Sequence, residues 1–136
     1  YSTAELKKKL YAKEYSTAEI SQVIQECTRH GFLNDEHYAE NLAAAVYARG
    51  GGKRKAIQKL RTKGIDSELI KETLAEKEDG NVMTELEAAA GALSRKASAF
   101  AREPDPRKRR EKALRFLAGR GFSAQVAYEA LRKLAM

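Results

Sequence analysis

The segment Leu60–Asp66, with the sequence LRTKGID, decides the fold that we expect for this chain of 136 residues. Gly64 suits the left-handed backbone conformation that closes many helices. Asp66 has a side-chain oxygen that can accept a hydrogen bond from the first backbone amides of a following helix. The segment therefore predicts one helix, a short turn and a second helix.

The same arrangement recurs twice more along the chain, with apolar residues at offsets of 5 and 14 positions. The three trios are Leu10, Tyr15 and Ile24; Leu60, Ile65 and Leu74; and Leu117, Phe122 and Leu131. A capping residue follows the middle member of each trio, namely Ser16, Asp66 or Ser123. Gly121 repeats the role of Gly64, whereas Glu14 occupies that position in the first copy, so we expect the first turn to be built differently. Such internal repetition is typical of tandem helical repeats.

Further helix starts lie outside these turns. The segments Ser2–Glu5 and Ser16–Glu19 both read STAE, which is the pattern of a capping box. Asn34 and the pair Asp105–Pro106 indicate the starts of two more helices. Apolar residues at helical spacing predict a leading helix before the second pair and one long leading helix before the third. The residues of the latter stripe are Leu86, Ala90, Leu93, Ala97 and Phe100.

These patterns predict an all-α protein in which tandem three-helix, helix-turn-helix-like repeats form an elongated, curved array. The expected repeats are residues 1–33, which lack a leading helix, residues 34–80 and residues 81–136. Because the chain begins with Tyr1 rather than Met, we expect that a segment preceding it is missing from this sequence.

The positive charge is concentrated in two stretches of the chain. The net charge is +7, with 26 Lys and Arg against 19 Asp and Glu. The first stretch, Arg49–Lys63, carries +7; the second, Pro106–Arg120, carries +6; and Gly64–Ala90 between them carries −6. The basic residues of the first are Arg49, Lys53, Arg54, Lys55, Lys59, Arg61 and Lys63. Those of the second are Arg107, Lys108, Arg109, Arg110, Lys112, Arg115 and Arg120.

The two basic stretches occupy the same helix of two repeats, with Lys53 aligned to Arg110. Charge runs are usually solvated helix faces, but this recurrence in register favours a surface that binds a polyanion. Basic residues at the start of a helix also oppose the helix dipole, which argues against a purely stabilising role.

Other chemistry finds little support. Gly50–Lys53 lacks the spacing and the following Ser or Thr of a phosphate-binding loop. Cys27 is the only cysteine and there are two histidines, too few for a structural zinc site, so we expect Cys27 to be a buried apolar residue. No arrangement of nucleophile and base suggests an enzyme, and we expect no cofactor and no metal. The lone cysteine and the absence of a long apolar stretch predict a cytoplasmic protein without a membrane segment.

Four segments resemble motifs of the RecX family, whose members regulate the bacterial RecA recombinase. Gly31–Ala39 (GFLNDEHYA) resembles the family signature Gly-Tyr-Leu-Asp-Asp-Glu-Arg-Phe-Ala, with Asn34 and His37 as departures. Arg49–Ile65 resembles the stretch that begins Arg-Gly-Tyr-Gly-Pro and ends Lys-Gly-Ile, although Gly51 and Lys53 replace its aromatic residue and its proline. Ser2–Leu10 and Arg120–Phe122 resemble the family's first helix and the motif of its last unit.

The resemblance implies a crescent of three-helix repeats that lies in the groove of the RecA–DNA filament as a monomer and needs no cofactor. It further implies inhibition of the ATPase, strand-exchange and coprotease activities of RecA in DNA repair, recombination and the SOS response. Two alternatives remain open. One is a stand-alone nucleic-acid binder built from helix-turn-helix-like pairs, and the other is a helical scaffold for acidic proteins.

Overall fold

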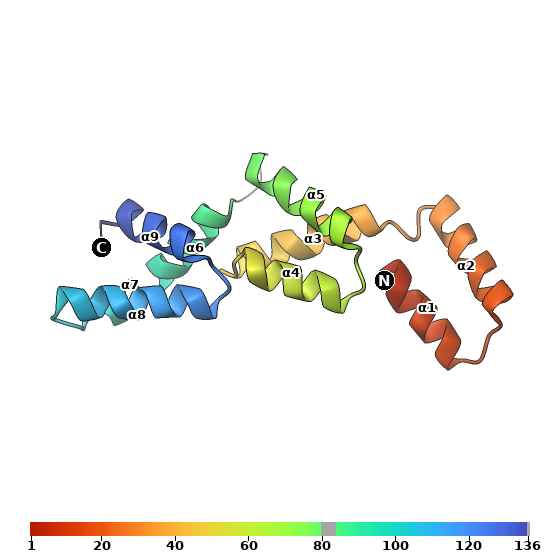
Figure 1. Ribbon diagram of the computed structural model, residues 1–136, viewed down its shortest axis with the longest axis horizontal. Coiled ribbons are helices and arrows are strands. Elements are labelled where there is room, and N and C mark those ends of the chain that lie inside the picture. The colour runs from red at the N-terminus through yellow and green to blue at the C-terminus, as the bar shows by residue number, and fades with distance from the viewer. Residues whose placement is uncertain (80–83, 136) are drawn as a thin grey trace.

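The computed structural model describes residues 1–79 and 84–135, and all regular structure in these ranges is helical. The helices are α1 (Thr3–Ala12), α2 (Thr17–Arg29), α3 (Asp35–Ala48), α4 (Lys53–Thr62), α5 (Ser67–Asp79), α6 (Glu85–Arg95), α7 (Ala97–Ala101), α8 (Pro106–Gly119) and α9 (Ala124–Lys133). They form an elongated array with α1 and α2 at one end, α3 to α5 in the middle and α6 to α9 at the other end (Figure 1). The all-α prediction is confirmed. The boundary expected at residues 80 and 81 lies outside the described residues.

Most helix starts follow the capping residues that the sequence indicates. The side chain of Asp66, however, forms no hydrogen bond with a described residue, so the prediction that it caps α5 was wrong. Ser2 and Ser16 each form a complete capping box, in which serine and glutamate satisfy each other's backbone amides. The side chains of Asn34, Asp105 and Ser123 accept hydrogen bonds from the first turns of α3, α8 and α9. Each of these contacts spans two or three positions, which is why the sequence alone predicts them.

The three turns adopt one backbone conformation. Gly64 and Gly121 have φ of +76° and +93°, and Glu14 has φ of +67°. In the second and third turns the amide of Ile65 or Phe122 donates to the carbonyl of the leucine five positions earlier, at 3.0 and 3.1 Å. The amide of Tyr15 makes the same bond, at 3.4 Å. The expectation that the first turn is built differently was therefore wrong, because left-handed backbone is strained rather than forbidden for a residue with a side chain.

We expect Glu14→Gly to stabilise the first helix pair by about 1 kcal/mol, because glycine adopts the left-handed conformation without a steric cost. Hydrogen exchange of the α1 and α2 amides would measure the change. Lys13→Gly is the matched control, since Lys13 has an ordinary φ of −90° and its replacement should destabilise the pair. Equal effects of the two substitutions would contradict the strain at Glu14.

The long leading helix expected in the third repeat is broken at Lys96. The amide of Lys96 donates to the carbonyl of Leu93 and the amide of Ala99 donates to the carbonyl of Lys96, both at 3.0 Å, so the backbone tightens to three-residue turns here. The redirected α7 brings Phe100 against Phe116 of α8, with ring centroids 5.7 Å apart in an edge-on arrangement. The apolar stripe is therefore divided between two helices, and the aromatic contact accompanies the break.

One continuous hydrophobic core joins the middle and last repeats. Leu60 and Leu117 are fully buried, and small residues such as Ala43 and Ala89 on the leading helices let the helices approach closely. The equivalent residues of the first repeat are more accessible, and Tyr15 is 48% exposed. Among the described helices none precedes α1 to cover them as α3 and α6 cover the equivalent residues. Cys27 is accordingly half-buried, so the prediction of a buried cysteine was wrong.

Both joints between repeats are built on a helix N-terminus. The amide of Thr3 in α1 donates to a carboxylate oxygen of Asp35 at 2.8 Å, and the amide of Lys53 in α4 donates to Glu85 at 2.6 Å. Asp35 and Glu85 are the first residues of α3 and α6, the leading helices of the next repeats. The repeats are therefore connected through a carboxylate that binds the positive end of the neighbouring helix dipole.

A second contact at each joint involves the turn of the next repeat. The hydroxyl of Ser2 donates to the carbonyl of Lys63 at 2.6 Å, and the amide of Gly52 donates to the carbonyl of Arg120 at 2.8 Å. At the second joint there is no room for a side chain, because a Cβ on Gly52 would lie 2.5 Å from the backbone of Gly121. The joint between the middle and last repeats is thus a direct backbone contact.

Candidate functional site

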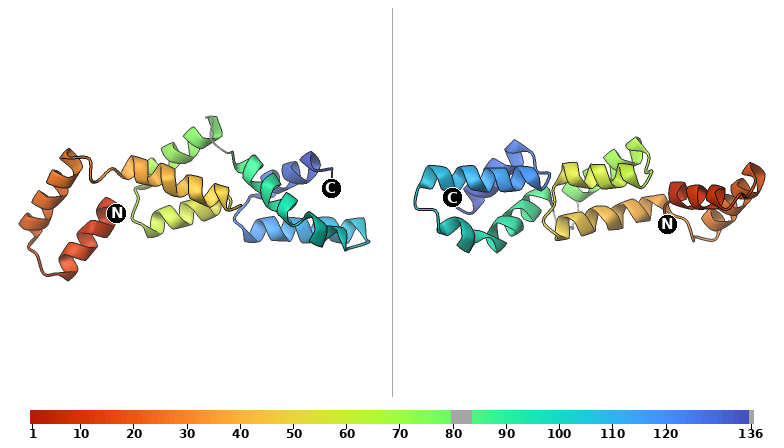
Figure 2. Two further views of the ribbon diagram at one scale, coloured as in Figure 1. Left: turned by 180° about the vertical axis from the view of Figure 1, so that it is seen from behind. Right: turned by 90° about the horizontal axis from the view of Figure 1, so that it is seen from below.

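Helices α4 and α8 lie in line along one edge of the array, with the end of α8 at the start of α4 (Figures 1 and 2). The amide of Arg54 donates to the carbonyl of Gly121 at 3.1 Å, and its guanidinium lies 3.4 Å from the carbonyl of Ala118. At a rise of 1.5 Å per residue the two helices cover about 35 Å. The fold therefore joins the two basic stretches of the sequence into one strip, which we call the basic edge.

Part of the positive charge at the start of α8 is bound within the chain. The ammonium of Lys112 lies 2.7 Å from the carboxylate of Glu103, and the guanidinium of Arg109 donates to the Glu103 carbonyl at 3.0 and 3.1 Å. The bond from Lys112 is the main reason why the pKa of Glu103 lies below its usual range. Arg107 pairs with Glu111 at 3.5 Å, an exposed pair that contributes little to stability.

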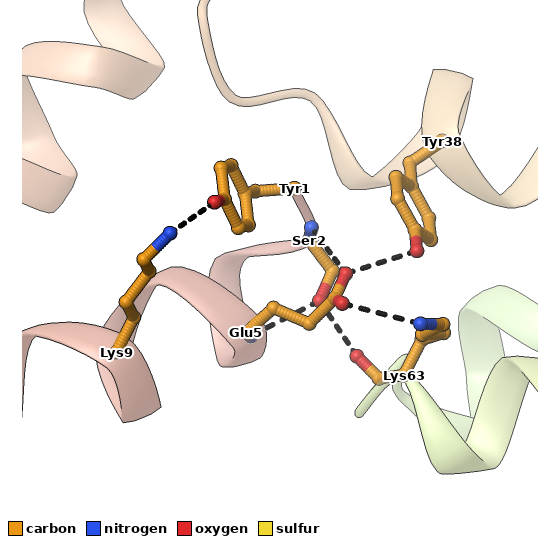
Figure 3. Close-up of polar contacts among 6 residues, drawn as sticks. All are labelled: Tyr1, Ser2, Glu5, Lys9, Tyr38 and Lys63. Atoms are coloured by element: carbon orange, nitrogen blue, oxygen red, sulfur yellow. Dashed lines mark hydrogen bonds and ion pairs between the residues drawn. The ribbon is translucent and has the colours of Figure 1, made fainter. Parts of the chain in front are cut away.

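Lys63 also has an internal partner, in the joint between the first and middle repeats. The carboxylate of Glu5 accepts hydrogen bonds from the amide of Ser2 at 3.1 Å and the hydroxyl of Tyr38 at 2.9 Å, and lies 3.3 Å from the ammonium of Lys63 (Figure 3). The Ser2 amide is the largest cause that lowers the pKa of Glu5 to about 2. Burial and the hydrogen bond to Glu5 raise the pKa of Tyr38 to about 12. Lys63 therefore holds two repeats together.

This joint predicts a pH window for the stability of the first repeat. The folded pKa of Glu5 is lowered from 4.5 to about 2, so its stabilisation is present above pH 4.5 and lost as the pH falls toward 2. The folded pKa of Tyr38 is raised from 10.0 to about 12, so its stabilisation is present below pH 10.0 and lost as the pH rises through 12. Hydrogen exchange of α1 across this range measures both losses. Glu5→Gln should remove the loss of stability at acid pH, and Tyr38→Phe should remove the loss at alkaline pH. An unchanged pH profile of stability in either variant would contradict the role given to that residue.

Eight residues of the basic edge have side chains that form no ion pair or hydrogen bond with any other described residue. They are Arg49, Lys53, Lys55, Lys59, Arg61, Lys108, Arg110 and Arg115. All are exposed except Lys55 and Lys59, which are half-buried. These eight side chains are the part of the predicted site that has no partner within the described residues.

The starts of α4 and α8 already bind carboxylates of the chain, so their basic residues give less support for an external anion than the sequence suggested. The basic residues at the start of α4 oppose the helix dipole, but the carboxylate of Glu85, which is only 6% exposed, already binds the amide of Lys53. Asp105 caps α8 in the same way through the amide of Arg107, at 3.0 Å. The positive ends of both helices are therefore bound by carboxylates of the chain. The exposed basic side chains are what indicates a polyanionic partner.

The part of the acidic stretch that belongs to α5 lies on a different edge from the basic one. Its exposed members Glu68 and Glu72 belong to α5, which follows the upper edge of Figure 1, whereas α4 and α8 follow the lower edge. The side chains of Glu76, Glu78 and Asp79 lie outside the described part. The separation of charge along the chain is thus preserved in space for α5, whereas Glu85 of the same stretch binds the amide of Lys53 at the basic edge.

Two cations near the basic edge are absent from the sequence prediction. Arg95 and Lys96, at the break between α6 and α7, lie with Arg49 and Arg120 around a hollow of about 170 Å³. Sequence reasoning placed this break inside one continuous amphipathic helix and so overlooked both residues. Their position as two adjacent cations at a helix end is the signal that could have identified them.

A metal-binding cluster and a membrane-spanning helix are both absent from the described residues. No group of three or more His, Cys, Asp or Glu side chains is placed to hold a metal ion there. Within the same residues, every helix is too short or too polar to cross a membrane.

Two family models match the chain. The second three-helix domain of RecX matches residues 34–74, and the third three-helix domain of RecX matches residues 84–131. The chain belongs to the RecX family. The regulatory protein RecX of Trichlorobacter lovleyi is 34% identical over 98% of this chain and 86% of that protein. The regulatory protein RecX of Legionella pneumophila is 32% identical, over 98% and 85% of the two chains.

The crystal structure of RecX from Lactobacillus salivarius has the same fold. It superimposes with a TM-score of 0.86 over 98% of this chain and 85% of that one, at 21% sequence identity. The fold of helical repeats expected from the sequence is thus confirmed. Because the relatives are named as regulatory proteins, the chain is assigned to a regulatory family.

Proposed function

We propose that this RecX chain is a non-enzymatic regulator that binds the RecA–DNA filament and inhibits its ATPase, strand-exchange and coprotease activities. The observation that carries the proposal is the basic edge, in which α4 and α8 lie in line on an elongated array of repeats. Family membership directs the proposal to RecA. The chain acts as a monomer in the cytoplasm, where the filament forms.

The shape of the basic edge favours a long partner over a compact one. A nucleic-acid strand carries a phosphate about every 3.4 Å, so about 35 Å of helix faces about ten phosphates or a comparable length of acidic protein surface. Seven of the eight unpaired cations are spread along α4 and α8, and Arg49, the C-cap residue of α3, is the eighth. A filament of protein and nucleic acid presents both kinds of negative surface at this length scale.

The direct test is to add the protein to RecA already assembled on single-stranded DNA and to follow ATP hydrolysis. We expect hydrolysis to fall when the protein is present in amounts comparable to RecA. A rate that stays unchanged at a stoichiometric ratio would contradict the proposal.

The second candidate is a stand-alone nucleic-acid binder, which the exposed cations of the basic edge also suit. The helix after the middle turn, α5, presents exposed Glu68 and Glu72, which oppose its use as a DNA-reading helix. Titrating labelled DNA with and without RecA at several salt concentrations separates the candidates. A stand-alone binder would bind a single strand in the absence of RecA, and the logarithm of its binding constant would fall with the logarithm of the salt concentration with a slope of about −0.7 per phosphate contacted. A scaffold for acidic proteins would show no dependence on DNA.

A further inference from the structure

Four cations from three helix ends surround one hollow beside the joint between the middle and last repeats. Arg49, Lys96 and Arg120 are the C-cap residues of α3, α6 and α8, and Arg95 is the last residue of α6. The hollow measures about 170 Å³, and Ala92 and Phe116 complete its lining, with no carboxylate among the described lining residues. A water molecule occupies about 30 Å³ of liquid, so the hollow has room for a small polyatomic anion.

Helix C-termini attract cations, and this attraction accounts for only part of the charge. Each helix end carries roughly half a negative charge, so three ends offset roughly 1.5 of the four positive charges. More than half of the positive charge is therefore left without an internal counter-charge at the hollow.

Contacts with the backbone and with a ring orient the arginines. The guanidinium of Arg120 donates to the carbonyl of Arg49 at 3.2 Å and stacks over the ring of Phe116, 5.0 Å from its centroid. The Nε of Arg95 donates to the carbonyl of Gly91 at 3.3 Å. These bonds use one donor of each guanidinium and leave others for a ligand, while they reduce the entropy that binding would cost.

The equivalent joint between the first and middle repeats contains its own anion. By the repeat register Lys63 corresponds to Arg120, and Lys63 is paired with the carboxylate of Glu5. The position equivalent to Glu5 in the second joint is Lys55. One joint thus neutralises its cation internally, whereas the other adds a further cation and leaves Arg120 without a carboxylate partner among the described residues.

We propose that this hollow binds a phosphate group of a nucleic-acid strand, with Arg49, Arg95, Lys96 and Arg120 as the donors. Each phosphate of a strand presents two non-bridging oxygens that accept charge-assisted hydrogen bonds, and guanidinium groups match this geometry in bidentate pairs. Arg120 also lines a neighbouring hollow together with Arg54 and Lys55, so the backbone of a strand can continue from this phosphate onto α4. The site deepens the proposed function and rests on it for the choice of nucleic acid.

The test compares two double variants with the same change of charge at the end of a helix. Arg95→Gln with Lys96→Gln alters the hollow, and Arg132→Gln with Lys133→Gln alters the last turn of α9, outside the basic edge. Binding of fluorescein-labelled oligothymidylate, without RecA, is followed by anisotropy at several salt concentrations. We expect the first variant to bind about tenfold more weakly, with a salt slope shallower by about 0.7, which corresponds to one phosphate. The α9 variant should stay within about twofold of the unmodified chain.

Several results would overturn the site. Equal losses in the two variants would show that only net charge matters. Binding of inorganic pyrophosphate that depends on the hollow, with oligonucleotide binding that does not, would assign it to a small phosphate compound. Binding of polyglutamate that depends on the hollow, with oligonucleotide binding that does not, would assign the hollow to an acidic protein. Because RecA is absent, a failure of the RecA experiment leaves this result standing, and circular dichroism verifies that both variants remain helical.

Discussion

Gly121→Ala is expected to lower the free energy of unfolding by about 3 kcal/mol, because it adds backbone strain and overpacking at one position. Gly121 has φ of +93°, and a Cβ there would lie 2.7 Å from the amide nitrogen and 2.8 Å from the Cβ of Lys55. Neither neighbour can move without displacing α4, which contacts the same turn through the amides of Gly52 and Arg54. Urea unfolding followed by circular dichroism would measure the loss.

Two other glycines provide matched controls for the alanine substitution. Gly31 has φ of +77° but nothing near its added Cβ, so Gly31→Ala measures the strain alone, which we expect to cost about 1 kcal/mol. Gly119 lies at the end of α8 in open space, so Gly119→Ala should be neutral or stabilise the helix by up to about 1 kcal/mol. If Gly121→Ala costs no more than Gly31→Ala, the joint between the middle and last repeats is not closely packed.

Reversing three charges at the start of α4 is expected to reduce inhibition of the RecA ATPase by about a hundredfold, because three attractive contacts become repulsive. The variant is Lys53→Glu, Arg54→Glu and Lys55→Glu, which changes the part of α4 that meets α8 at the centre of the basic edge. Acidic residues in a first helical turn favour the helix dipole, so the helicity should be retained. Inhibitory concentration in the RecA ATPase assay is the measurement.

The control for this variant reverses three exposed cations outside the basic edge, namely Arg102, Arg132 and Lys133. It changes the net charge by the same amount and should leave the inhibitory concentration within about twofold of the original, since it leaves the basic edge intact. Equal losses of inhibition in the two triple variants would show that the effect depends on net charge alone. Unchanged inhibition in the α4 variant would remove α4 from the binding surface.

The sequence predicted those parts of the fold that depend on near neighbours. Ser2, Ser16 and Asn34 cap helices through amides three positions ahead, and the trios of apolar residues repeat in register. The same local reasoning was wrong at Glu14, where the glycine rule expresses a preference and the packing of the helix pair overrides it. It also missed the break at Lys96, because the contact of Phe100 with Phe116 that accompanies the break is tertiary.

The candidate site divides in the same way. The two basic stretches could be counted from the sequence, but their internal partners could not. Lys63 and Glu5 are 58 positions apart, and Arg120 and Arg49 are 71 positions apart. Sequence spacing carries no signal for such pairs, so Lys63 was assigned to the binding surface although it holds a joint, and Arg95 was omitted although it borders the hollow.

The sequence by itself determined that this chain is a helical array, where most of its helices begin, and that its positive charge gathers on two equivalent helices. Capping and helical periodicity act over three to four positions, so they can be predicted from the sequence. Only the tertiary structure decided how these charges are used: which carboxylate binds the start of α4, which cations are already paired, and which four meet at one hollow. Electrostatic interactions depend on distance through space, and packing of the repeats sets that distance.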